Sequence, residues 1–210
     1  IERFTWLSQG SLSGFHAVYG SMLDKIINFA GLKWVDEEIL VLSTRYSALM
    51  SLETLSDKMA LRKRVAEKIG MDALELERLM TPMEGVYAIA DHTKALAFIL
   101  ADGVVPSNVK AGYLARLLVR RTYRLLRFLG IEDRLADIVD LQIDCWSQDF
   151  PNLKDSRGET LEALEVEERK YKSTLNRGVG LVRRMVGGLK ADGKACIPTE
   201  TLAELYDSHG

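Results

Sequence analysis

The sequence predicts an all-α protein built from two packed helical subdomains, with one long helix near the C-terminus. Three observations support this prediction. Apolar residues recur at helical spacing along most of the 210 residues, only four prolines interrupt the chain, and no strand pattern is longer than a few residues. Hydrophobic residues make up 47% of the chain, which is enough for a buried core at this length.

The apolar periodicity places the helices in order along the chain. The expected helices are residues 14–29, 37–50, 55–69, 73–80, 83–101, 110–129, 132–149 and 159–186, with a last short helix from 199. Asp36 and Asp72 are expected to cap the second and fourth helices, because a carboxylate accepts hydrogen bonds from the first backbone N–H groups. Thr81-Pro82 is expected to start a separate helix, since proline is favoured in the first turn.

Glycines are expected to end several helices, because they readily adopt the left-handed conformation of a helix C-terminus. Gly103 and Gly130 end the helices on either side of the turn at residues 106–108, and the glycine pair at 187–188 is expected to end the long helix. Residues 153–157 are the best candidate boundary between the subdomains.

The composition excludes several classes of site. Cys145 and Cys196 lie far apart without a neighbouring histidine, so we expect two free thiols in a reducing cytosol rather than a disulfide or a metal site. The three histidines are also widely separated, and no zinc site is expected. No apolar run reaches the roughly 18 residues that span a bilayer, so we expect a cytoplasmic protein without a membrane partner.

Positive charge is concentrated between Val104 and Gly130, a segment with six Lys or Arg residues and no acidic residue. The whole chain has a formal net charge of only -2, so this concentration is local. Such a patch indicates a partner that carries phosphate groups.

The arginines of this segment form a stripe along the predicted helix 110–129. At about 100° per residue, one face collects Arg116, Arg120, Arg124 and Arg127. The opposite face, which we expect to be buried, collects Leu114, Leu118, Leu125 and Phe128. The stripe is able to follow a phosphate backbone. Alternatively, it is a solvated surface paired with acidic residues of the next helix, which are Glu132, Asp133, Asp137 and Asp140.

Three further residues stand out. Arg121 falls on the apolar side of this helix, where a guanidinium is costly to bury unless it pairs with an acid or reaches a ligand. Asn108, just before the helix, is expected by default to cap it, although its amide also has the donors and the acceptor that reading a base edge requires. Asp207 lies near a helix C-terminus, which is unfavourable for the helix dipole and hints at another role.

Several motifs follow one another in a specific order along the whole chain. They are Ile1-Glu2-Arg3-Phe4-Thr5-Trp6, Ala90-Asp91-His92, the segment DGVVPSN from Asp102 to Asn108, Gly112-Tyr113, Arg120-Arg121, the segment TLNRG from Thr174 to Gly178, and Leu205-Tyr206-Asp207. As an ordered set they resemble the alanyl-tRNA synthetase family, its archaeal branch more than its bacterial one. The first motif resembles the end of motif 3 of class II synthetases.

The resemblance implies that the chain is the tRNA-recognition region that follows the aminoacylation core. It implies a tail of the catalytic core at residues 1–10, a helical tRNA-recognition subdomain at 11–152, and a second helical subdomain with the long helix at 153–210. Asn108 and Asp207 would then read a G·U wobble pair in the acceptor stem of tRNA(Ala). They would do so from the minor groove, where the guanine amino group is the main distinguishing feature.

The resemblance also assigns roles to the positive charges. Arginines would position the phosphates while the other two side chains specify the base pair. The arginines expected to contact tRNA are Arg116, Arg120, Arg121 and Arg124. Many family members have another Asn or Gly and a basic residue where this chain has Val109-Lys110-Ala111, so a further contact is either lost or supplied by Lys110.

Arg3 resembles the motif 3 arginine that holds the ATP phosphates in class II synthetases. The complete enzyme would use ATP and Mg²⁺ to attach alanine to tRNA(Ala). The other catalytic motifs, the editing domain with its zinc ligands and the dimerising region are not in this sequence. We therefore expect this fragment to bind none of these cofactors, to be inactive alone, and to act with the catalytic and editing domains of the synthetase.

Two other functions stay open. The predicted helix 159–186 has an apolar seam, which suits a helical scaffold that binds another protein, although Gly178 and Gly180 interrupt the seam. A general nucleic-acid-binding helical domain would instead bind any duplex with a strong dependence on salt. His92 is a candidate general base, but its position within a helix beside Asp91 favours a structural hydrogen bond.

Overall fold

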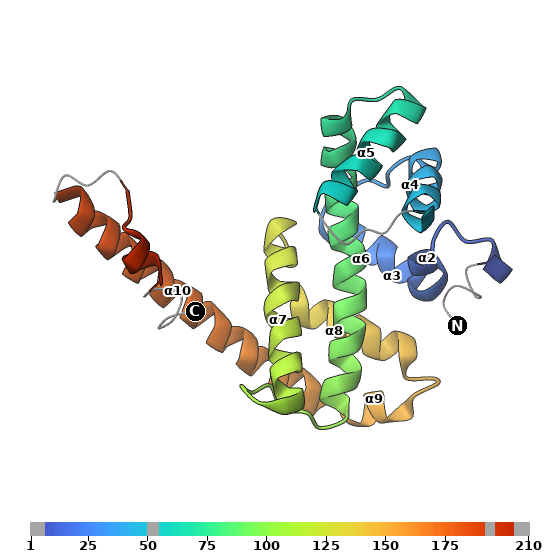
Figure 1. Cartoon of the computed structure of the whole chain (residues 1–210). Coiled ribbons are helices and arrows are strands. Elements are labelled where there is room, and N and C mark those ends of the chain that lie inside the picture. The colour runs from blue at the N-terminus through green and yellow to red at the C-terminus, as the bar shows by residue number, and fades with distance from the viewer. Residues whose placement is uncertain (1–6, 50–54, 192–195, 204–210) are drawn as a thin grey trace. The chain divides into compact units, whose positions relative to one another are not determined.

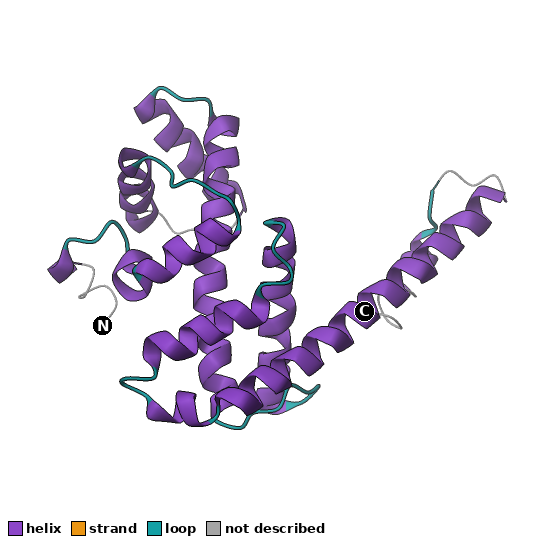
Figure 2. Ribbon diagram, turned by 180° about the vertical axis from the view of Figure 1, so that it is seen from behind, coloured by secondary structure: helices purple, strands orange, loops and turns teal. Residues whose placement is uncertain are grey.

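The computed structural model describes residues 7–49, 55–191 and 196–203. All regular secondary structure within these ranges is helical, which confirms the predicted all-α class (Figure 2). In chain order the helices are α2 (Gly14–Tyr19), α3 (Ser21–Phe29), α4 (Glu37–Leu49), α5 (Leu55–Ile69), α6 (Ala73–Ala101), α7 (Lys110–Phe128), α8 (Leu135–Trp146), α9 (Pro151–Asp155) and α10 (Arg157–Ala191). Residues 199–203 are also helical.

The chain divides into two compact units, residues 1–164 and 165–210, and the division falls inside α10. The first unit contains α2 to α9 and the beginning of α10, which is the long helix that the sequence predicts. The domain boundaries expected after residues 10 and 152 stay a prediction.

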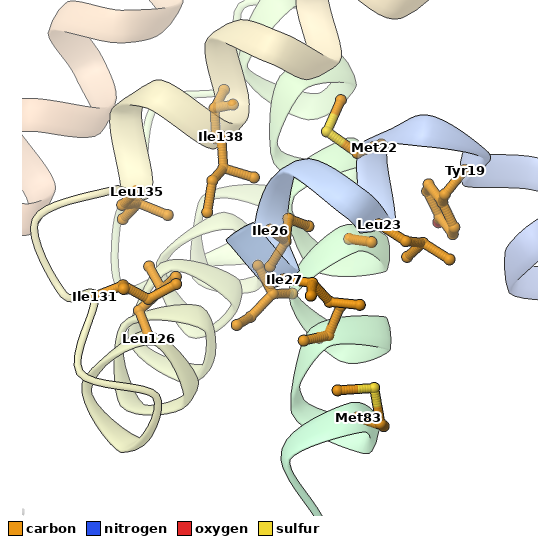
Figure 3. Packing of buried hydrophobic residues seen from close by; sticks show 14 of the residues in the cluster. Tyr19, Met22, Leu23, Ile26, Ile27, Met83, Leu126, Ile131, Leu135 and Ile138 are labelled. Carbon is orange, nitrogen blue, oxygen red and sulfur yellow. The ribbon is translucent and has the colours of Figure 1, made fainter. Parts of the chain in front are cut away.

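Helix α6 is the centre of the first unit, because α3, α5, α7, α8 and α9 all pack against it (Figure 1). Its buried hydrophobic residues include Leu76, Met83, Val86, Ile89, Ala90, Leu96, Ala97 and Leu100. Figure 3 shows Met83 in the same cluster as Leu23 of α3, Leu126 of α7 and Ile138 of α8. A helix that is apolar nearly all round is stable only when other elements surround it in this way.

A buried polar side chain ties α8 to α6. The Nε2 atom of Gln142 donates hydrogen bonds to the carbonyl oxygen of Ala90 at 2.9 Å and to Oγ1 of Thr93 at 3.0 Å. The Nε1 atom of Trp146 donates to Oε1 of Gln142 at 3.1 Å. Because both ends of the buried amide have partners, the amide avoids the penalty of desolvation and favours one register between the two helices.

The structure contradicts the expected break at Pro82, since α6 runs through this residue. Proline removes one backbone donor but does not end the helix, because an arginine of α5 braces both sides of it. Arg62 bonds Glu77 at 2.6 Å before the proline and Glu84 at 3.2 Å after it, and its Nη2 atom also donates to Oγ1 of Thr81 at 3.2 Å. Buried side chains before and after the proline also hold the two parts of α6 in one helix.

Several other boundaries differ from the expected ones. The predicted helix 14–29 is two helices, because Gly20 has a positive φ of 47° that interrupts it. The expected boundary segment, residues 153–157, overlaps the end of α9 and the start of α10, and α8 is shorter at both ends than predicted. Helix α10 continues through the glycine pair at 187–188, where each glycine costs about 1 kcal/mol relative to alanine and weakens the helix without ending it.

The expected caps are confirmed. The backbone N–H of Glu38 donates to Oδ1 of Asp36 at 2.9 Å, and that of Leu74 donates to Oδ2 of Asp72 at 2.9 Å. Gly103 follows α6 with a φ of 79°. Cys145 and Cys196 are free, and both are exposed. No helix in the described ranges combines the length and the apolar character needed to cross a membrane.

Helix α7 packs on α6, and its buried face differs from the expected one. The buried residues of α7 are Gly112, Ala115, Val119, Thr122, Tyr123 and Leu126. Leu114 and Phe128, expected in the core, are 49% and 59% exposed. Leu118 and Leu125 are half-buried at the edge of the core. The prediction of the buried face is therefore wrong at Leu114 and Phe128.

Leu126→Ala should lower the free energy of unfolding by about 2–5 kcal/mol, because Leu126 is 0% exposed and its removal leaves a cavity. Phe128→Ala, at a position 59% exposed on the same helix, should change that free energy by less than about 1 kcal/mol. Urea denaturation of the two variants measures the difference. Equal losses would mean that the outer face of α7 is buried after all.

Candidate nucleic-acid interface

The turn that carries Asn108 is held against the first turn of α7. The backbone N–H of Ser107 donates to the carbonyl oxygen of Gly112 at 3.0 Å, and the hydroxyl of Ser107 donates to the carbonyl oxygen of Val109 at 3.1 Å. Lys110 begins α7 with a φ of 50°, which is unusual for a residue other than glycine. The chain is therefore bent tightly between the turn and the helix.

Gly112 is the point of closest approach between this turn and α7. A Cβ atom at position 112 would lie 2.2 Å from Oγ of Ser107 and 2.4 Å from the carbonyl oxygen of Val105. The second contact is with the backbone, so it is not relieved by a side-chain rotation. Only glycine fits at this position without moving the turn.

Asn108 does not cap α7, so the default interpretation from the sequence is wrong. The N-cap residue is Val109, and no side chain caps the helix. The exposed Asn108 side chain instead accepts a hydrogen bond at Oδ1 from Nη1 of Arg116, one of the arginines of the predicted stripe. The Nη2 atom of Arg116 also donates to the carbonyl oxygen of Pro106 at 3.4 Å. Two residues expected to contact RNA are thus in contact with each other.

The acidic residues expected to neutralise the stripe are partly engaged elsewhere. Asp137 pairs with Arg134 at 2.8 Å, and Asp140 pairs with Arg157 at 2.5 Å. Within the described ranges, Arg124 forms no ion pair with an acid of α8. The interpretation of the stripe as a surface paired with α8 is therefore weakened at this arginine.

Arg121 is exposed rather than buried on an apolar face. The face to which its helical angle assigns it also carries Leu114 and Phe128, and that face is open. A charged side chain there has no burial cost to offset, so it needs no internal partner. Arg121 is available to a ligand, together with the exposed Tyr113 and Arg124 of the same helix.

Two of the residues singled out in the sequence lie outside the described residues. These are Asp207, expected to read the base pair, and Arg3, expected to contact ATP. The expected roles of Asp207 and Arg3 therefore stay predictions. In the part of the chain that the structure describes, no three His, Cys, Asp or Glu residues form a group that could hold a metal ion.

The first unit also contains a cavity of about 540 Å³ that the sequence analysis did not predict. It is lined by residues of α2, α4, α5 and α6, and none of the residues expected to bind tRNA is among them. The rings of Phe15 and Tyr87 stack in its wall with centroids 4.8 Å apart. Burial raises the pKa of Tyr87 to about 12. The aromatic residues come from segments distant in the sequence, so no local motif indicated the cavity.

His92 has a buried Nδ1 atom without a hydrogen-bond partner, so the expected structural hydrogen bond is not formed at this atom. Burial lowers the pKa of His92 below its ordinary value; Asp91 opposes this shift and Arg121 adds to it. His16 also has a pKa lowered by burial, and Asp24 opposes that shift. Both histidines therefore favour the neutral form in the folded protein.

The free energy of unfolding should fall as the pH decreases from about 7 towards 5. A histidine with a folded pKa below its unfolded pKa binds more protons in the unfolded state when the pH lies between the two values. Its contribution to stability is thus complete above the unfolded pKa and is lost as the pH falls towards the folded pKa. His92→Gln should reduce this dependence, which urea titrations at about pH 7.5 and 5.5 measure. An unchanged dependence would contradict the assignment to His92.

Comparison with known proteins identifies the family. The profile of the family described as "tRNA synthetases class II (A)" matches residues 1–210. Over all 210 residues, the chain is 47% identical to the alanine–tRNA ligase of Methanothermobacter thermautotrophicus. The chain belongs to the alanyl-tRNA synthetase family. It is also 48% identical over the same length to the alanine–tRNA ligase of Pyrococcus furiosus, which agrees with the expected archaeal resemblance. The chain spans 23% of the length of each of these two synthetases.

Gly112→Ala should displace the turn that carries Asn108 in this member of the alanyl-tRNA synthetase family. The new methyl group would meet the backbone of Val105, so the free energy of unfolding should fall by about 1–3 kcal/mol. Gly158→Ala in α10 is the matched control, because nothing lies within 4 Å of its Cβ position, and it should be neutral or stabilising. Urea denaturation compares the two variants; a neutral Gly112→Ala would contradict the close approach.

Proposed function

We propose that this chain is the part of an alanine–tRNA ligase that recognises the acceptor stem of tRNA(Ala). Asn108 and Asp207 read a G·U wobble pair from the minor groove of that stem. The observation that carries the proposal is the exposed Asn108 amide, which accepts a hydrogen bond from Arg116 in a turn that Ser107 ties to the start of a helix rich in arginine. A short polar side chain on a rigid helical platform is suited to the wide, shallow minor groove of RNA.

The positive side chains supply binding without sequence information. Arg120, Arg121 and Arg124 contact phosphates of the stem, and Lys110 adds a contact beside Asn108. An acceptor stem carries regularly spaced negative charge, and each phosphate contact releases counterions, so binding depends strongly on salt. Phosphate contacts position the helix, and contacts with the base edges provide the specificity.

The complete ligase attaches alanine to tRNA(Ala) in the cytoplasm at the expense of ATP, with Mg²⁺. Most of that chemistry belongs to sequence outside this chain, which spans 23% of its relatives' length. Arg3 contributes to the ATP site, while the described residues contribute recognition of tRNA. The partners of this chain are therefore the acceptor stem and the catalytic and editing domains of the ligase.

A second function, binding of nucleic acid without specificity, is favoured by the outer face of α7. Tyr113 is 55% exposed, and Arg121 and Arg124 are exposed on the same helix. Aromatic rings and guanidinium groups bind many nucleic acids by stacking and charge. This function predicts equal affinity for all stems, so a comparison of two stems distinguishes it.

The proposal is tested by binding this chain to an acceptor-stem hairpin with a G·U pair and to the same hairpin with a G·C pair. We expect tighter binding to the G·U hairpin, measured by fluorescence anisotropy. Asn108→Ala should reduce the free energy of binding to the G·U hairpin by about 1–3 kcal/mol, because one base-edge contact is lost. The G·C hairpin should bind this variant almost as it binds the unchanged chain.

Asn28→Ala is the matched control, since it removes an exposed asparagine from α3 of the same unit. It should leave both affinities unchanged. Equal binding of both hairpins by the unchanged chain would favour the unspecific function, and no binding at all would contradict both.

A further inference from the structure

The hydrogen bond between Asn108 and Arg116 restricts what the asparagine is able to recognise. A guanidinium has five N–H donors and no acceptor, so only the carbonyl oxygen of the amide bonds to it. The Oδ1 atom of Asn108 therefore faces Arg116, and the Nδ2 amine is the end that remains for RNA. This orientation follows from the chemistry of arginine and does not depend on distinguishing oxygen from nitrogen in the amide.

Arg116 is itself well placed to hold this orientation. Its side chain is half-buried, and its second terminal nitrogen donates to the carbonyl oxygen of Pro106 at 3.4 Å. The guanidinium of Arg116 therefore bonds to Pro106 and Asn108, the residues on either side of Ser107. The close contact of Gly112 with Ser107 and Val105 keeps the turn at a constant distance from α7. These contacts hold α7, the turn and the Asn108 side chain together.

We infer that Arg116 is a positioning residue that orients the Asn108 amide as a hydrogen-bond donor towards the base pair. This inference rests on the proposed function. It replaces the expected role of Arg116 as a phosphate contact. The stripe then serves two purposes: Arg116 supports specificity, and Arg124 supports affinity.

A donating asparagine recognises acceptor atoms. In the minor groove of a G·U pair, these are O2 of uracil, N3 of guanine and the ribose 2′-hydroxyl oxygens. The guanine amino group is a donor, so it requires a different partner with an acceptor. A carboxylate such as that of Asp207 has this chemistry. The asparagine and the aspartate are therefore complementary rather than redundant.

Arg116→Gln tests the inference in this chain against the same pair of hairpins, over a series of salt concentrations. A positioning role predicts that the preference for G·U over G·C falls about tenfold, close to the value for Asn108→Ala, while binding of the G·C hairpin and the salt dependence stay the same. The double variant Arg116→Gln with Asn108→Ala should bind no more weakly than Asn108→Ala alone, because both changes remove one contact.

Arg124→Gln is the matched control, since it removes an exposed arginine two turns further along α7. It should weaken binding of both hairpins equally and reduce the slope of log affinity against log salt by about 1. The same result for Arg116→Gln would overturn the inference and assign Arg116 to a phosphate. Hairpins with 2-thiouracil, which changes O2 of uracil, or with 3-deazaguanine, which removes N3 of guanine, then identify the acceptor. Only the hairpin modified at the acceptor atom should bind Asn108→Ala and the unchanged chain equally.

Arg116→Lys keeps the charge but has no planar fork to bond Asn108 and Pro106 together. It should lose most of the preference for G·U with an unchanged salt slope, whereas a phosphate contact would tolerate lysine. Circular dichroism and urea denaturation establish that each variant is folded, and Arg116→Lys provides the test if Arg116→Gln is unstable. If the unchanged chain binds the G·U and G·C hairpins equally, the proposed function and this inference are overturned together. If the preference for G·U is kept in both Arg116→Gln and Arg116→Lys, the inference alone is overturned.

Discussion

The first unit depends on the burial of α6 among its neighbours. Helices α3, α5, α7, α8 and α9 all pack against α6, so its position constrains the position of each of them. Gly103 follows the end of α6, and after a short turn α7 returns along α6 (Figure 1). The turn between these two helices carries Asn108. The side chain proposed to read RNA thus lies in the turn that joins the two helices, and contacts of that turn with α7 hold it in place.

The close approach of α7 to the turn that precedes it positions the side chains of that turn. Gly112 lies at the contact of α7 with the turn, and Ala115 and Thr122 continue the row of small buried residues along the helix. Small residues allow close approach, and close approach holds Ser107 and Asn108 near the second turn of α7. Arg116 lies in that turn, within reach of the amide.

The distribution of charge has a similar logic. The chain is nearly neutral as a whole, yet Arg121 and Arg124 remain exposed on α7. Acidic residues of α8 are used to hold α8 to α10, through Arg157, and to brace the start of α8, through Arg134. Because these acids stabilise their own surroundings, they do not neutralise all the arginines of α7. The resulting surface is positive and also apolar at Leu114 and Phe128.

The sequence by itself determined the all-α class, most helix ends and the family, because caps, glycines and ordered motifs are local features. It did not determine which face of α7 is buried. Leucines and arginines outline a conventional amphipathic pattern, but the buried face runs instead through Gly112, Ala115, Val119, Thr122, Tyr123 and Leu126, because packing against other elements decides which face is covered. The sequence also did not determine that α6 continues through Pro82, which Arg62 from another helix stabilises. Nor did it determine that Asn108 bonds to Arg116, because this contact depends on the conformation of the turn. Tertiary structure decided these features because each depends on a contact that local periodicity does not encode.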